Sequence, residues 1–170
     1  MSRAIGWINI MKKWNLNEWL CCDDEMKMDS FLARFEDEKA LRRFAVLNAK
    51  SVEALLTDSR SRSAVVVAEA YLDNRVTAQE LEVAFYESVS AFEEIESTYV
   101  SEEDPTRYEE DRENAALVAL WAALPVGHTG ISSLESAQES ALHTAFYCFQ
   151  IHCSQALKEQ LERFKAARLV

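Results

Sequence analysis

Apolar side chains recur every three or four positions along most of this chain, which is the spacing that predicts amphipathic helices. The longest regular series lies between residues 77 and 100. Its members are Leu81, Phe85, Ser88, Phe92, Ile95 and Tyr99. Steps of four and three residues are typical of a helix that packs along another helix. A second series, in residues 37–56, predicts another helix with Leu41, Phe44, Ala45, Asn48, Val52 and Leu55 on one face.

The last predicted helix begins after Ser132 and is expected to extend for more than about 30 residues. Its apolar positions are Leu142, Phe146, Phe149, Cys153, Leu157, Leu161 and Phe164. In its middle, the stretch AFYCFQIHC (145–153) is apolar around most of the helix. Such a helix is either buried in a bundle or shared with a partner. Tyr147 and Ile151 are therefore candidate contact residues.

Three short motifs mark helix starts, and few residues mark turns. Thr77 with Glu80, Thr106 with Glu109, and Ser132 with Glu135 have the spacing of capping boxes. The chain has only 3 glycines and 2 prolines, whereas sheets and hairpins need many turn residues. We expect an all-α, single-domain bundle over residues 1–170, with about six to eight helices and a long C-terminal helix. Residues 1–16 either pack on this bundle or form a mobile terminus.

The stretch TDSRSRSAVVV (57–67) combines a helix start with two arginines and three valines. Thr57 or Asp58 can cap the new helix, and burial on two sides would compensate for the low helix propensity of valine. Arg60 and Arg62 could bind an anion at the helix start. A structural role of this stretch as a joint between helices is favoured over an anion site, because the carboxylate of Asp58 already occupies the helix start. The expected partners of the two arginines are Glu36, Asp37 and Glu53.

The net charge of −11 weighs against direct binding to nucleic acid or to an anionic membrane. Ten acidic residues fall between positions 93 and 113, against Arg107 and Arg112 alone. This segment is either a solvated helix end with its loop or a docking site for a basic partner. The candidate interaction residues are Glu93, Glu94, Glu96, Glu102, Glu103 and Asp104.

The beginning of the chain and its cysteines suggest a compartment. MSRAIGWINIMKK has neither a long apolar core nor a small-residue cleavage site, so we expect no signal peptide. No apolar run reaches the roughly 18 residues that span a bilayer. With Cys21, Cys22, Cys148 and Cys153 expected to be reduced, a cytoplasmic protein is the simplest interpretation.

No motif points to a specific chemical reaction. Cys148 and His152 are four residues apart and could share a metal ion, but zinc ligands usually come in closely spaced pairs. A Cys–His nucleophile would lack an orienting residue, and no glycine-rich phosphate loop is present. His128 is expected to be a solvated loop histidine. We therefore assign no catalytic, cofactor-binding or metal-binding residues and expect a protein that is not an enzyme.

A signature can be followed through residues 17–84, with Trp19, Asp58, Arg60, Arg62 and Tyr71 among its residues and its strongest block between Leu55 and Asp73. On these residues, the segment resembles the N-terminal module of a large family of uncharacterised bacterial proteins found in planctomycetes such as Gemmata. Further matching positions are Glu18, Leu20, Cys22, Asp24, Phe31, Leu32, Lys39, Leu41, Arg42, Leu55, Leu56, Ala64, Glu69, Asp73 and Ala84. The family's cysteine-rich patch is replaced here by Val46, Leu47, Asn48 and Ala49. The resemblance implies a helical module of bacterial origin, and it implies no reaction.

These observations predict a non-enzymatic helical interaction module, or an accessory subunit of a bacterial complex. One alternative is a small acidic inhibitor or immunity-type protein that masks a basic, nucleic-acid-binding surface. Another is an enzyme with a thiol or carboxylate site that the sequence does not locate. A protein partner is expected, with self-association as a further option.

Overall fold

The structure, a computed structural model, describes residues 25–99, 106–130 and 132–152 and four single positions at 159, 162, 163 and 166. All regular secondary structure within these residues is helical, with no strand, so the predicted fold class is confirmed. The α-helices are α3 (Glu25–Leu32), α4 (Glu38–Ser51), α5 (Ser59–Leu72), α6 (Ala78–Tyr99), α7 (Arg107–Ala122) and α8 (Ser133–His152). Two short 3₁₀-helices are η1 (Glu53–Leu55) and η2 (His128–Gly130). The helices predicted before residue 25 lie outside the described residues.

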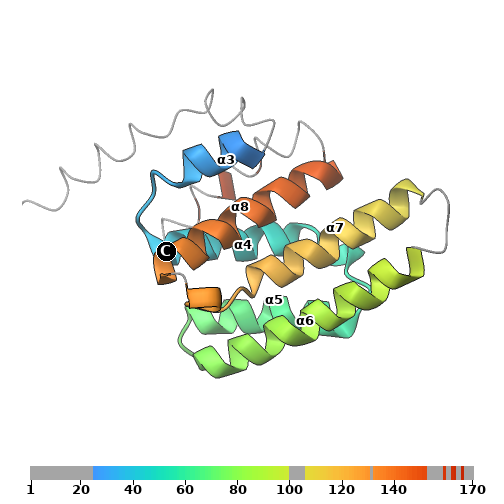
Figure 1. Cartoon of the computed structure of the whole chain (residues 1–170), viewed down its shortest axis with the longest axis horizontal. Coiled ribbons are helices and arrows are strands. Elements are labelled where there is room, and N and C mark those ends of the chain that lie inside the picture. The colour runs from blue at the N-terminus through green and yellow to red at the C-terminus, as the bar shows by residue number, and fades with distance from the viewer. Residues whose placement is uncertain are drawn as a thin grey trace, which may run out of the picture.

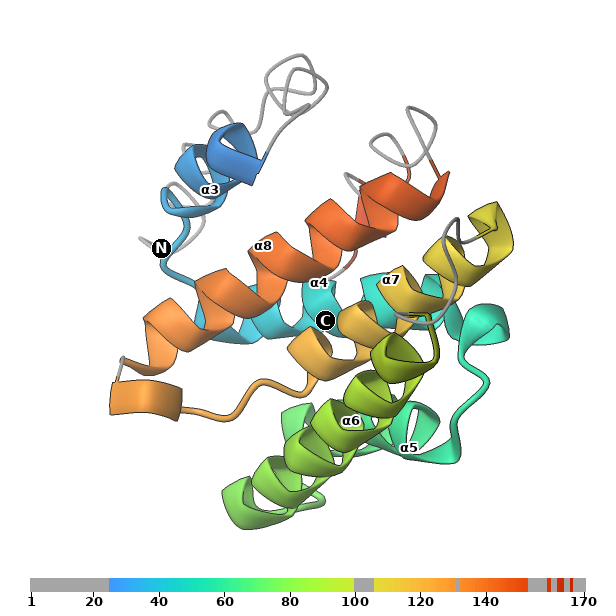
Figure 2. The ribbon, with the colours of Figure 1, turned by 45° about the vertical axis from the view of Figure 1, so that its right-hand side comes forward.

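The helices form a layered bundle (Figure 1). Helices α4 and α7 occupy its middle and contact each other, α8 on one side and α5 on the other. Helix α3 lies on the outer face of α8, and α6 lies against α5 and α7 (Figure 2). Because α4 and α7 have neighbours on both sides, they connect the two sides of the bundle.

The core consists of three clusters that follow these layers. The first joins α3, α4 and α8 around Phe31, Leu32, Leu41, Phe44 and Leu142. The second joins α4, α5, α6 and α7 around Val46, Ala68, Leu81, Phe85, Leu120 and Leu124. The third joins α4, α5, α7 and α8 around Val52, Val65, Val118, Cys148 and Ile151. Each large buried side chain stabilises the fold by about 1.5–3 kcal/mol, so these clusters carry the bundle.

Capping boxes begin three of the helices, as predicted. In the box before α6, the Thr77 amide donates to Glu80 Oε2 at 2.7 Å, and the Glu80 amide donates to Thr77 Oγ1 at 3.2 Å. The same reciprocal bonds join Thr106 with Glu109 and Ser132 with Glu135. Hydrogen bonds from the capping residue lower the pKa of each glutamate. Each box satisfies free amides of the first turn and fixes where the helix begins.

Two predictions about α4 and α5 need correction. The helix predicted for residues 37–56 ends at Ser51 and is followed by the separate turn η1. The expectation that the valines of α5 are buried on two sides of the helix is wrong. Val65 is buried and Val67 is half-buried, but Val66 is 61% exposed. Helix α5 lies at the outside of the bundle, so one of its faces meets solvent.

The apolar series of α6 is buried only in part. Leu81, Phe85 and Ser88 are buried, whereas Phe92 and Ile95 are half-buried. The side chain of Tyr99 lies outside the described residues. The prediction that His128 is a solvated loop residue is wrong, because its half-buried ring packs 4.9 Å from the ring of Phe85.

Helix α8 is the start of the long last helix that the sequence predicts, and its apolar side chains pack inside the bundle. Leu142 and Cys148 are buried, and Phe146 and Phe149 pack half-buried against the first cluster. Positions 159, 162, 163 and 166 are also helical, while Cys153, Leu157, Leu161 and Phe164 lie outside the described residues. Within the described part of the chain, no helix has both the length and the apolar character needed to cross a membrane.

Candidate functional site

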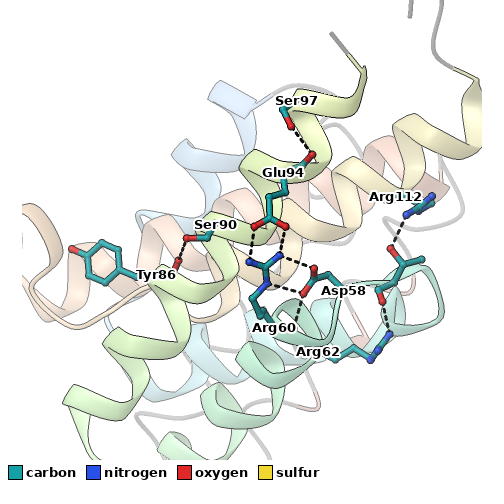
Figure 3. Close-up of polar contacts among 9 residues, drawn as sticks. Asp58, Arg60, Arg62, Tyr86, Ser90, Glu94, Ser97 and Arg112 are labelled. Atoms are coloured by element: carbon teal, nitrogen blue, oxygen red, sulfur yellow. Dashed lines mark hydrogen bonds and ion pairs between the residues drawn. The ribbon is translucent and has the colours of Figure 1, made fainter. Parts of the chain in front are cut away.

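Asp58 and Arg60 form a network that joins the start of α5 to the second half of α6. Asp58 caps α5, because its Oδ1 accepts from the Arg60 amide at 2.7 Å. The Arg60 guanidinium also donates to both oxygens of Asp58, through Nε at 3.1 Å and Nη2 at 2.9 Å. It then reaches Glu94 on α6, with Nη1 at 2.9 Å from Oε1 and Nη2 at 2.7 Å from Oε2 (Figure 3). One arginine thus bridges two carboxylates on neighbouring helices.

This network confirms the cap and corrects the predicted partners. Arg60 pairs with Glu94 because α5 and α6 are antiparallel neighbours, so the start of one lies beside the end of the other. Asp37, one of the expected partners, instead caps α4 by accepting from the Ala40 amide at 3.0 Å. The hydrogen bonds from Arg60 lower the pKa of Asp58 and of Glu94. The ionised network therefore stabilises the contact between the two helices.

Arg62 and Arg112 hold the turn that precedes α5. Arg62 Nη1 donates to the carbonyl oxygens of Leu56 and Thr57, so it does not meet the carboxylates that the sequence suggested. Arg112 on α7 donates from Nη2 to Thr57 Oγ1 at 2.8 Å (Figure 3). The arginines of the signature stretch are engaged in structural contacts, as a joint requires. Of the other signature residues, Tyr71 is half-buried against the second cluster, and Trp19 lies outside the described residues.

Carboxylates gather where the second half of α6 faces the first half of α7. Glu93, Glu94 and Glu96 are exposed on α6. Burial first, and then Glu96 and Glu110, raise the pKa of Glu113 on α7. We call Glu93, Glu96, Glu110 and Glu113 the acidic surface. Sequence reasoning grouped the acids of this segment but missed the facing of Glu96 and Glu113 across two helices.

Little positive charge offsets the acidic surface. Arg107 lies 3.8 Å from Glu110 and 3.2 Å from Asp111, both on its own helix. Among the described residues, Glu93, Glu96 and Glu113 form no ion pair. The predicted candidates Glu102, Glu103 and Asp104 connect α6 to α7 and lie outside the described residues. The described part of this surface therefore carries a local excess of negative charge.

The other predicted contact residues lie on α8, largely inside the bundle. Ile151 is 9% exposed and packs in the third cluster with Val118 of α7, so it contributes to the core and not to an open face. Tyr147 is half-buried, and its ring lies 5.4 Å from the ring of Phe146. The apolar side chains of α8 therefore pack mainly within this chain, because α3, α4 and α7 surround the helix.

Cys148 is a buried thiol held against α4. Its sulfur donates to the carbonyl oxygen of Asn48 at 3.5 Å. Burial raises the pKa of Cys148 to about 12, so the thiol is protonated at neutral pH. The side chain of His152, its predicted metal-sharing neighbour, lies outside the described residues. Within the part that is described, no three His, Cys, Asp or Glu side chains come together as a metal site.

The geometry offers a surface with excess negative charge and a hydrogen-bonded network that joins the start of α5 to α6 and α7. Comparisons of the chain with models of protein families, with curated proteins and with solved structures find no match. The resemblance to the planctomycete module therefore stays a prediction.

Proposed function

We propose that this protein is a non-enzymatic interaction module, or an accessory subunit, that binds a basic protein partner through the acidic surface. The observation that carries the proposal is the proximity of Glu113 on α7 to Glu96 on α6 and to Glu110, three residues earlier on α7. A solvated helix end would spread its carboxylates apart. Here the fold brings three of them together at the edge of the core.

This arrangement has a physical consequence for binding. Like charges at neighbouring positions destabilise a fold, and partial burial of a carboxylate adds to that cost. Lysine or arginine side chains of a partner would remove both penalties, because they pair with the carboxylates and neutralise the repulsion. The free energy lost in the isolated protein would then be recovered in the complex.

The Arg60 network supports the same proposal. It ties the second half of α6 to the start of α5 through Glu94, and Arg112 ties α7 to Thr57 in the preceding turn. Both helices that carry the acidic surface are thereby fixed at the end where the acids lie. A surface held in place loses less conformational entropy when it binds.

A salt titration with two matched variants tests this function. The chain with Glu93→Gln, Glu96→Gln and Glu113→Gln is compared with a control carrying Glu36→Gln, Glu53→Gln and Glu82→Gln, which removes as much charge elsewhere. Each is immobilised, cross-linked to partners in cell extract and analysed by mass spectrometry. We expect the native chain and the control to retain the same basic protein, and the acidic-surface variant to lose it.

The salt dependence supplies the second readout. Screening shortens from about 10 Å at 0.1 M salt to about 3 Å at 1 M, so the complex should dissociate in 1 M NaCl. Retention by the acidic-surface variant, or in 1 M NaCl, would show that an apolar contact holds the partner instead. If nucleic acid competes with the protein for its partner, the partner's nucleic-acid-binding surface is the one that is covered. That result would favour the acidic-inhibitor alternative over an accessory subunit.

A further inference from the structure

Helices α6, α7 and α8 lie side by side as one layer of the bundle, with α4 and α5 behind them (Figure 1). Helix α7 is the middle helix of this layer and contacts all four of the others. Its residues Ala115, Val118, Ala119 and Ala122 are buried in the third cluster, against α4, α5 and α8. Among the described residues, no further helix covers α7 on the opposite side, which is therefore an outer face of the layer.

Leu117 lies in the centre of this outer face. Residues three or four positions apart share one side of a helix, so Leu117 is in line with Glu110, Asn114 and Trp121. Glu110 is exposed and the other three are half-buried. Leu117 is not part of any of the three core clusters. An apolar side chain in the middle of α7 is thus directed away from the core.

Aromatic rings extend this apolar position across the layer to α8. The ring of Trp121 stacks on the ring of His143, with centroids 3.9 Å apart and an angle of 21° between the planes. The ring of Tyr147, one turn further along α8, lies 6.3 Å from that of His143 at an angle of 22°. All three side chains are half-buried, so part of each ring reaches the surface.

Phe92 of α6 extends the row on the other side of Leu117. Burial, Glu96 and Glu110 raise the pKa of Glu113, so Glu96 is its neighbour across the two helices. Helices α6 and α7 run in opposite directions (Figure 1), so the turn before Glu96 lies beside the turn after Glu113. Those two turns hold Phe92, which is half-buried, and Leu117. We call Phe92, Leu117, Trp121, His143 and Tyr147 the aromatic strip.

Carboxylates border the aromatic strip at both ends. Glu113 precedes Trp121 by eight residues on α7, and Glu139 precedes His143 by four on α8. Because Trp121 and His143 stack and the two helices run in opposite directions, these carboxylates lie at opposite ends of the strip (Figure 1). At 1.5 Å per residue they are about 18 Å apart along the layer, which is the length of a helix of roughly 12 residues.

The layer as a whole is short of positive charge. Helix α6 has six acidic residues and no basic one, α7 has four and two, and α8 has two and none. Helices α4 and α5, behind the layer, have two acidic and six basic residues. The two arginines of α7 are engaged near its start, Arg107 with Asp111 and Arg112 with Thr57. Charge complementarity therefore selects a partner segment that is basic.

We propose that the aromatic strip receives an amphipathic helix of the partner. Its apolar side chains lie on Leu117, Trp121 and Tyr147, and its lysines or arginines pair with the carboxylates at the two ends. This inference rests on the proposed function and names the element through which the basic partner binds. A second copy of this chain fits less well, because a symmetric contact between two strips would bring carboxylates against carboxylates.

Fluorescence anisotropy of a labelled peptide tests the site on the full chain, in about 0.1 M NaCl. The probe is a peptide of about 14 residues with leucine on one face of a helix and lysine on the other. We expect saturable binding of this peptide, and none of a peptide in which glutamate replaces lysine. Leu117→Ser should weaken binding by about fivefold or more, whereas Leu117→Met, which keeps an apolar side chain, should bind like the native chain. The control Val66→Ser, at an exposed valine of α5, should change nothing.

The acidic-surface variant separates this inference from the proposed function. If that variant binds the peptide more weakly but Leu117→Ser does not, the acidic surface binds without the strip and the inference is wrong. If only Leu117→Ser weakens binding, the strip is a docking site and the function based on charge is wrong. A peptide that does not saturate the native chain also refutes the strip. Ultracentrifugation completes the test: a dimer of the native chain that Leu117→Ser dissociates would make the occupant a second copy and overturn the proposal.

Discussion

The two halves of α6 share one apolar periodicity but differ in what covers them. In the first half, Leu81, Ala84 and Phe85 are buried in the second core cluster. In the second half, Phe92 and Ile95 are half-buried, and Glu93 and Glu96 face solvent. A salt bridge from Arg60 to Glu94 adds a polar contact there.

This difference separates the part of the helix that supports the fold from the part that is free to bind. Periodicity indicates which residues share a face, but whether that face is covered depends on where the neighbouring helices lie. The first half contributes to stability through burial. The second half contributes a surface, and its position depends on ion pairs at the α5 joint.

The largest expected effect comes from shortening one apolar side chain in each half. Leu81→Ala should destabilise the protein by about 2–5 kcal/mol, because it leaves a cavity in the core. Ile95→Ala should cost clearly less, since its side chain is only half-buried. Urea denaturation of both variants measures the two losses. Equal losses would mean that the second half of α6 is as well packed as the first.

A smaller loss of stability is expected at the joint formed by Asp58, Arg60 and Glu94, which holds the second half of α6. Asp58→Ala should cost about 0.5–2 kcal/mol through loss of the helix cap. The pKa of Asp58 is lowered in the folded protein, so its contribution is present above its ordinary pKa near 3.8 and is lost as the pH falls through the folded value. The gap between variant and native protein in thermal unfolding should therefore be full at pH 7 and narrow below about pH 4.

Asp73→Ala, at the opposite end of α5, is the matched control for this joint. Asp73 follows the last turn of the helix, where a negative charge is unfavourable, and its ion pair with Arg75 is exposed and therefore weak, so its removal should change stability little. If the two alanine variants unfold at the same temperature, Asp58 does not anchor α5 in the way its hydrogen bonds suggest.

The smallest expected change in stability concerns the acidic surface, and here the substitution should stabilise the protein. Because the folded pKa of Glu113 is raised, its ionisation costs stability above its ordinary pKa. Glu113→Gln should therefore stabilise the protein at pH 7, by about 0.2–0.5 kcal/mol from the repulsion of like charges. This gain should vanish as the pH falls through the ordinary pKa. Glu82→Gln, in the first half of α6, should show no such gain, and calorimetry at pH 7 and pH 4 compares them.

Local patterns predicted much of this fold. Each capping box needs only two residues three positions apart, so the starts of α6, α7 and α8 follow from the sequence. The apolar series likewise predicted the all-helical class. The exposure of Val66 and the extent of α4 could not be obtained in this way, because they depend on how the helices pack.

Contacts between distant residues were the harder part. Arg60 and Glu94 are 34 positions apart, and nothing in the sequence selects this glutamate from 29 acidic residues. Arg42 lies outside the apolar series of residues 37–56, yet it is buried, and the carbonyl oxygen of Leu124 accepts its hydrogen bond. The same limit applies to Glu113, whose neighbour Glu96 lies on another helix.

The buried thiol of Cys148 can report transient opening of the contact between α4 and α8. Alkylating reagents attack the thiolate, and a pKa of about 12 leaves roughly one thiolate in 10⁵ at pH 7. Iodoacetamide should therefore label this position only during brief opening events, and peptide mapping would separate it from the other cysteines. Its labelling rate would count how often the two helices part, without any probe being introduced.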